Sequence, residues 1–103
     1  MMHQAFFWLR KQDDAAARDE LIAGLRALAS IPQVRSLRIT LPAQTEARDV
    51  VDASYAVCET MEFSSLADQA VYQTHPLHLA FIERCGHLWE RVVVYDGVDV
   101  QAG

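Results

Sequence analysis

The segment Tyr72–His78 reads YQTHPLH, which places one tyrosine and two of the chain's four histidines within a short stretch. Histidine is the side chain whose ordinary pKa lies nearest neutral pH. A tyrosine phenol can donate a hydrogen bond to an oxygen on which negative charge develops. These residue types indicate three alternatives: a site that moves protons, a metal-binding pair, or a polar corner between two helices.

The proline in this segment predicts where the two outer side chains fall. Pro76 suits the first position of a helix, which puts His78 in the first turn of that helix and Tyr72 in the last turn of the preceding one. The positive end of a helix dipole disfavours the imidazolium, so it favours a neutral His78. We predict His78 as a candidate general base and Tyr72 as a candidate acid, in chemistry that needs no cofactor.

The remaining histidine of the segment favours a structural interpretation. His75 precedes Pro76, which pushes it out of the helical region and fixes it as a flank of the helix. A His75/His78 metal pair is disfavoured because Pro76 interrupts it and no acidic or cysteine ligand stands nearby, so we expect no metal site. Tyr72 and His78 could also be buried polar groups that bond to the backbone, which leaves that alternative open.

Apolar spacing and turn residues predict the elements that carry these side chains. Strands are expected at residues 3–11, 33–41, 50–63 and 90–97, and helical segments at 13–31, 64–74 and 76–89. The order β-α-β-β-α-β is typical of an α+β, ferredoxin-like subunit, in which a four-stranded antiparallel sheet carries its helices on one face.

The first predicted strand is apolar on both of its faces. Ala5, Phe7 and Leu9 alternate with Phe6 and Trp8. A sheet with one wet face would alternate apolar and polar residues instead. Because the helices cover only one face, we predict that the other face meets a second copy, giving a homodimer through the sheet.

Four motifs along the chain resemble those of one family. They are Ile31–Val34 (IPQV), Phe63–Ser65 (FSS), the Y-x-x-H-P-x-H segment from Tyr72 to His78, and Val93-Val94-x-Asp96. With these motifs the chain resembles the stress-responsive dimeric α/β-barrel (Dabb) domains over nearly its whole length. The resemblance implies a single domain at 1–103 that dimerises through its sheet into an eight-stranded barrel.

The same resemblance implies a site. In one branch, similar to polyketide cyclases, the motif's tyrosine and final histidine form a polar cluster in a cleft with a histidine of the first strand. If His3 faces the helices with Phe7, it points toward Tyr72 and His78. The residues expected to line the pocket beside Tyr72 and His78 are His3, Phe7, Val57, Glu59, His75 and Val92.

Two positions of this predicted pocket depart from the cyclase-like branch. Val57 is apolar where that branch can carry a histidine, and Glu59 brings a charge where an apolar residue would be easier to bury. Tyr55 and Met61 are expected on the same face of the third strand. The departures leave open a pocket with a different ligand.

Composition excludes other classes of function. The 103-residue chain has a formal net charge of −5 and no basic stripe, so we expect no nucleic-acid partner. Its apolar runs are far too short to span a membrane, and its start does not resemble a signal peptide. Cys58 and Cys85 show no metal-binding spacing, and reduced thiols predict a cytoplasmic protein.

Three functions remain open. The protein binds a small, mostly apolar molecule in a cleft near Tyr72 and His78; or it is a cofactor-free enzyme of cyclase, isomerase or monooxygenase type; or it is a structural, stress-associated dimer without a ligand. A cavity of about 300 Å³ or more beside Tyr72 and His78 would favour the first two. A filled core, with His78 bonded to a backbone carbonyl, would favour the third.

Overall fold

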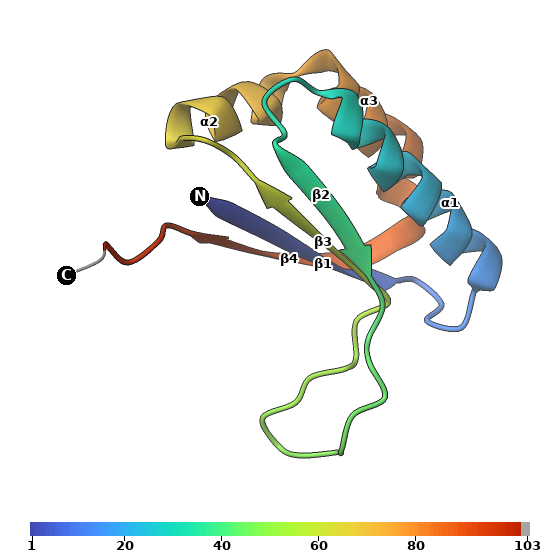
Figure 1. Cartoon of the computed structure of the whole chain (residues 1–103). Helices are drawn as coiled ribbons and strands as arrows, with labels where there is room; N and C mark the ends of the chain where they lie inside the picture. Colours follow the sequence, from blue (N-terminus) through green and yellow to red (C-terminus); the bar gives the residue numbers. More distant parts are fainter. Residues whose placement is uncertain (102–103) are drawn as a thin grey trace.

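The computed structural model describes residues 1–101, and residues 102 and 103 of the predicted domain lie outside the described residues. Four strands and three α-helices follow one another in the predicted order, with two short 3₁₀ turns (Figure 1). The elements are β1 (Met2–Leu9), α1 (Ala15–Ala27), η1 (Leu28–Ser30), β2 (Ser36–Thr40), β3 (Val57–Glu62), α2 (Leu66–Thr74), α3 (Pro76–Cys85), η2 (Gly86–Leu88) and β4 (Trp89–Gly97).

The strands form one antiparallel sheet in the order β2-β3-β1-β4, and the helices lie against one face of it (Figure 1). This is the ferredoxin-like arrangement that the element order predicts. The central strand β1 pairs with both β3 and β4, so Ala5 lies opposite Glu59 on one side and Val94 on the other. His3 in turn lies opposite Asp96, which puts these side chains on the helix-covered face.

The alternation of β1 sets which side chains enter the core. Every second residue of this strand is buried, and the buried residues are His3, Ala5, Phe7 and Leu9. Ala5, Phe7 and Leu9 meet buried leucines of α1 and buried residues of α3 in one apolar cluster, and His3 is buried on the same face. His3 therefore faces the helices together with Phe7, which is the condition under which it points toward Tyr72 and His78.

Side-chain caps fix the starts of the helices. Asp14 accepts a hydrogen bond from the Ala17 N–H at 3.0 Å. Ser65 accepts one from the Asp68 N–H at 3.1 Å, a cap of the kind that serine commonly provides at the start of a helix. These caps satisfy amide groups that would otherwise have no partner within the helix.

A glycine inside α1 has a packing reason. A Cβ at Gly24 would lie 2.6 Å from the Cys85 Sγ of α3. The absence of a side chain therefore lets α1 approach α3 closely, although glycine costs about 1 kcal/mol in a helix interior relative to alanine.

The third strand is much shorter than the predicted span of 50–63. It begins at Val57, and the preceding residues form a long loop that projects from the sheet (Figure 1). Asp52 accepts hydrogen bonds from the Ser54 N–H and hydroxyl, a local turn that competes with strand pairing. Tyr55 consequently leaves the helix-covered face: its ring packs 5.0 Å from that of Phe6, on the opposite face.

Smaller boundary shifts affect the other elements. The last helical segment ends at Cys85 instead of continuing to Trp89, which begins β4.

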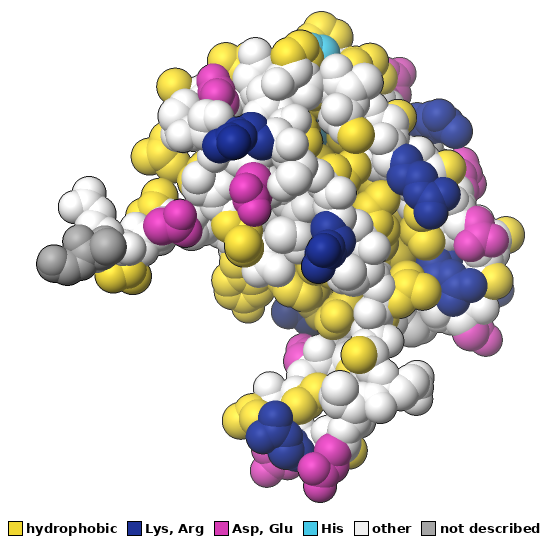
Figure 2. Space-filling view, in the orientation of Figure 1, with side chains coloured by type: hydrophobic (Ala, Val, Ile, Leu, Met, Phe, Trp, Pro, Cys, Tyr) yellow, Lys and Arg dark blue, Asp and Glu magenta, His cyan; other side chains and the backbone are white. Residues whose placement is uncertain are grey.

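In the view of Figure 2, acidic and basic side chains are interspersed over the surface and on the projecting loop. Within residues 1–101, no helix has the length and apolar character needed to cross a membrane.

Candidate functional site

A cavity of about 350 Å³ lies between the sheet and the helices α2 and α3. This volume lies within the range of small-molecule sites. Six of the eight residues predicted for the site line it: His3, Phe7, Glu59, Tyr72, His78 and Val92. The structure thus brings together the predicted acid and base candidates with the first-strand histidine.

Val57 and His75 do not line this cavity, so their assignment to the pocket is corrected. Val57 is completely buried in the core beside it. The His75 ring caps α3, because its Nδ1 accepts a hydrogen bond from the Leu77 N–H at 3.1 Å. Pro76 has no N–H to offer, so the next amide takes this role.

His78 is held in one orientation by its own helix corner. Its Nδ1 lies 3.0 Å from the Gln73 carbonyl oxygen, which can only accept, so Nδ1 carries the proton and donates it. Nε2 therefore keeps a lone pair when the ring is neutral. Burial lowers the pKa of His78, and nearby His3 lowers it further, against the opposing effect of the Gln73 bond.

Tyr72 lies deep in the site with its ring among other rings. It is 2% exposed, and its ring centroid lies 4.5 Å from that of His78 and 5.9 Å from that of His3. Burial, assisted by the charge of Glu59, raises the pKa of Tyr72 well above its ordinary value. The phenol therefore keeps its proton and can act as a hydrogen-bond donor.

Glu59 is the least expected group in the site. The residue is 1% exposed, and within residues 1–101 neither carboxyl oxygen has a hydrogen-bond partner. His3 Nε2 lies 3.4 Å from Oε1, close enough for electrostatic attraction but without hydrogen-bond alignment. Burial, reinforced by the charge of Asp96, raises the pKa of Glu59 to about 8.

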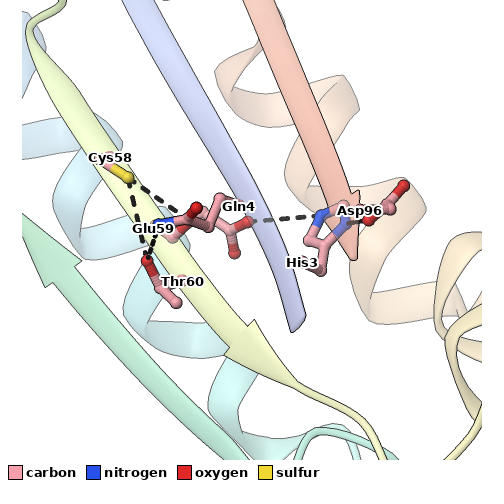
Figure 3. A network of polar contacts seen from close by, with 6 residues as sticks. All are labelled: His3, Gln4, Cys58, Glu59, Thr60 and Asp96. Carbon is pink, nitrogen blue, oxygen red and sulfur yellow. Dashed lines mark hydrogen bonds and ion pairs between the residues drawn. The ribbon is translucent and has the colours of Figure 1, made fainter. Parts of the chain in front are cut away.

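His3 joins Glu59 to a second carboxylate. Its Nδ1 lies 2.5 Å from the Asp96 Oδ1, and Figure 3 shows the two carboxyl groups approaching the ring from different strands. The His3 side chain is buried, whereas that of Asp96 is 46% exposed. The three residues therefore connect the surface with the interior of the site.

Sequence reasoning missed several residues of the cavity, above all Asp96. The signal was present, because Val92, Val94 and Asp96 alternate along β4 and share one face of the sheet. Gln69 and Trp89 were also missed. Gln69 lies one helical turn before Tyr72, so helical spacing could have placed it beside the site.

Other features do not compete with this site. A larger hollow, of about 490 Å³, lies between the end of α1 and β2, but the titratable groups among its described lining residues are the arginines Arg26 and Arg35. Arginine stays charged and does not serve as an acid or base near neutral pH. In the part of the chain that the structure describes, no group of three histidine, cysteine or acidic side chains is placed to hold a metal ion.

Comparison with known families identifies one match. The model of the family described as Stress responsive A/B Barrel Domain matches residues 1–99. The comparison with curated proteins found no match.

Solved structures share the fold. A Dabb family protein with a ferredoxin-like fold from Mesorhizobium loti has a TM-score of 0.77 at 22% identity, covering 97% of this chain and 96% of its own. A hydroxynitrile lyase from Passiflora edulis has a TM-score of 0.75 at 19% identity, covering 99% and 94%. A dimeric ferredoxin-like protein of unknown function from Thermobifida fusca has a TM-score of 0.71 at 18% identity, covering 91% and 85%.

Proposed function

Since the chain belongs to the Stress responsive A/B Barrel Domain family, we propose that it binds a small, mostly apolar molecule bearing a carbonyl or hydroxyl oxygen in the cavity beside Tyr72 and His78. One observation carries the proposal: polar side chains from five elements (β1, β3, α2, α3 and β4) converge on a cavity whose other walls are apolar. Ligand sites typically combine an apolar lining with a few oriented polar groups.

The apolar walls indicate the ligand's shape. Phe7, Phe81 and Trp89 line the cavity, and the Phe81 and Trp89 rings stack at 5.7 Å. Aromatic walls favour a flat, apolar body. Tyr72 and His78 can then form hydrogen bonds with one oxygen atom of the ligand.

The two tryptophans allow a direct test by fluorine NMR. Trp89 lines the cavity, whereas Trp8 lies on the opposite face, where its indole donates to the Ser54 hydroxyl at 3.0 Å. We would label the protein with 5-fluorotryptophan, assign the two signals with a Trp8→Phe variant, and titrate with acetophenone. The Trp89 signal should shift and saturate while the Trp8 signal stays in place. Equal, non-saturating shifts of both signals would contradict the proposal.

A second candidate function is proton transfer in the same cavity. The observation that favours it is the orientation of His78, whose Nδ1 bond to Gln73 leaves Nε2 as a base. The lowered pKa of His78 keeps that base neutral near pH 7. The hydroxynitrile lyase among the similar structures makes cyanohydrin cleavage a reaction to test.

Cyanohydrin cleavage gives the groups defined roles. His78 Nε2 takes the hydroxyl proton, the carbonyl forms, and the carbon–carbon bond to the nitrile breaks with its electron pair on cyanide. The cyanide takes a proton back from His78 and leaves as hydrogen cyanide. Tyr72 holds the carbonyl oxygen by its phenol.

The test is release of benzaldehyde from mandelonitrile, followed by ultraviolet absorbance. His78→Gln should lower the rate by about 100-fold, as expected for loss of a general base. His87→Gln, at an exposed histidine outside the cavity, is the matched control. If the wild-type protein released benzaldehyde no faster than buffer does, the proton-transfer function would be wrong, but the proposed ligand binding would not be affected.

We also propose that two copies associate through the uncovered sheet face. Phe6, Trp8 and Tyr95 lie on that face, and Tyr95 is 63% exposed. Contiguous aromatic surface of this kind is typical of interfaces. The similar structures described as dimeric support the association of two copies.

The cysteines support a reducing, cytoplasmic location. Cys58 and Cys85 are both free and buried in the described chain. Burial raises the pKa of each thiol, which keeps them unreactive small apolar groups. A thiol titration of unfolded protein purified without reductant should therefore find both cysteines reduced.

A further inference from the structure

Glu59 stands at the cavity wall without a hydrogen-bond partner in the described residues, and His3 Nε2 lies 3.4 Å from its Oε1. Two carboxyl oxygens lack partners in the described residues, although buried polar groups normally find them. A buried, unpartnered carboxyl is destabilising, so the fold gains nothing from it that an apolar residue would not provide better. Its place on the lining of the cavity indicates that the missing partner is a ligand.

We propose that Glu59 presents a carboxylic acid O–H to the ligand, and that this donor favours molecules that carry an acceptor oxygen and no negative charge. The inference rests on the proposed ligand-binding function and deepens it, because it names the class of ligand and the residue that selects it. Tyr72 supplies a second donor beside it.

The surroundings of Glu59 favour the protonated form. Burial and the charge of Asp96 both act against its ionisation. The titratable groups that line the cavity around it are His3 from β1, Asp96 from β4, Tyr72 from α2 and His78 from α3, while α1 contributes the apolar Leu25.

The same surroundings disfavour anionic ligands. A carboxylate entering the cavity would lose its hydration and lie near Asp96, which carries a charge of the same sign. A neutral ketone or aldehyde loses little hydration and accepts a hydrogen bond from Glu59. The cavity should therefore prefer a carbonyl compound to a carboxylate of the same size.

His3 and Asp96 give Glu59 a route for proton exchange. The His3 ring lies between the two carboxyl groups, with Nε2 toward Glu59 and Nδ1 toward Asp96 (Figure 3). Because Asp96 reaches solvent, a proton can pass along this row to Glu59 once His3 Nε2 and Glu59 Oε1, which lie 3.4 Å apart, close to hydrogen-bond distance. Glu59 therefore follows the pH of the solution despite its burial.

The experiment compares acetophenone with ethylbenzene, which has nearly the same shape but no oxygen. Binding is read from the Trp89 fluorine signal at pH 7 and pH 9. Wild type should bind acetophenone about three- to tenfold more tightly than ethylbenzene at pH 7, the range of one hydrogen bond. Its acetophenone affinity should fall up to about tenfold at pH 9, as Glu59 loses its proton.

Two variants give the matched controls. Glu59→Gln keeps an N–H donor at every pH, so its preference for acetophenone should persist at pH 9. Glu59→Leu should prefer acetophenone less than wild type does at pH 7, because Tyr72 is then the remaining donor, and this smaller preference should be the same at pH 9. The unchanged Trp8 signal verifies that each variant is folded.

Distinct outcomes separate the two levels of the proposal. Two results would overturn the role of Glu59 and leave ligand binding in place. One is a Glu59→Gln variant whose acetophenone affinity falls with pH as that of wild type does. The other is a Glu59→Leu variant that prefers acetophenone over ethylbenzene as strongly as wild type does. Binding of neither probe to wild type at pH 7 would overturn ligand binding and this inference together.

Discussion

The two faces of the sheet reverse the usual distribution of residues. The helix-covered face buries the polar side chains of His3 and Glu59, whereas the uncovered face carries Phe6 and Trp8. Strand β1 contributes to both faces, because polar His3 and aromatic Phe6 lie on opposite sides of it. Burial of polar groups and exposure of aromatic groups are both unfavourable for an isolated subunit.

The difference between the two faces indicates which kind of partner covers each of them. The uncovered face is broad and aromatic, with Arg91 lying 4.4 Å over the Trp8 ring, and a second flat sheet suits it. The covered face is closed by its own helices except for a cavity, which suits a small molecule. Variants on each face should therefore affect different properties.

The largest expected effect is on association. Phe6→Glu places a charge at the centre of the uncovered face, which the proposed dimer would have to bury at a cost of several kcal/mol. The mass measured by light scattering should fall from twice 11.6 kDa to 11.6 kDa. Leu79→Glu, at a residue of α3 that is 52% exposed, is the control and should remain dimeric.

The next effect is on the pH dependence of stability. Glu59 has a pKa of about 8 in the folded protein against an ordinary value of 4.5, so the native state keeps a proton that the unfolded chain releases. Stability should therefore fall as pH rises from about 4.5 to 8. The contribution of Glu59 at pH 7 is a loss of roughly 3 kcal/mol.

Glu59→Gln should remove this slope, so that the variant gains stability over wild type as pH rises. Urea unfolding at fixed protein concentration and several pH values measures it. A variant that is less stable than wild type by a growing margin toward pH 8 would mean that Glu59 is an ionised partner of His3.

A smaller effect is expected at Tyr72. Tyr72→Phe keeps the ring packing against Phe63 and His78 but removes the hydroxyl. Unfolding free energy should change by about 1 kcal/mol or less, while acetophenone binding weakens three- to tenfold. Loss of stability with unchanged binding would instead assign the hydroxyl a structural role.

The smallest effect is expected at Asp96. Asp96→Asn removes the nearby charge that raises the pKa of Glu59, so that pKa should fall below about 8. Burial is the larger cause, so most of the shift should remain. Carbon-13 NMR of labelled glutamate side chains measures the change, and a pKa that returns to 4.5 would show that burial is not the main cause.

The sequence predicted the fold and the position of the helix corner because local rules determine both. Pro76 begins α3, and Ser65 caps α2, as their residue types require. Residues 50–56 of the projecting loop were wrongly predicted as strand because their apolar residues resemble one, whereas the turn at Asp52 depends on side-chain hydrogen bonds.

The site was predictable only in part. Tyr72, His78 and His3 could be brought together from helical spacing and strand alternation, and the structure places all three on one cavity. His75 could not be excluded in advance, because whether its ring caps a helix or faces a cavity depends on its side-chain rotamer. Glu59 was suspected for its charge, but its missing partners are visible only in three dimensions.

A structure of crystals grown with acetophenone most directly tests whether one sheet face joins two copies while the other binds a small molecule. The account predicts two copies joined through Phe6 and Trp8, with one ketone in each cavity and its oxygen within hydrogen-bond distance of Glu59 or Tyr72. A cavity filled by its own side chains, with Glu59 and Tyr72 bonded to protein groups, would contradict the account and reduce the segment Tyr72–His78 to a helix corner.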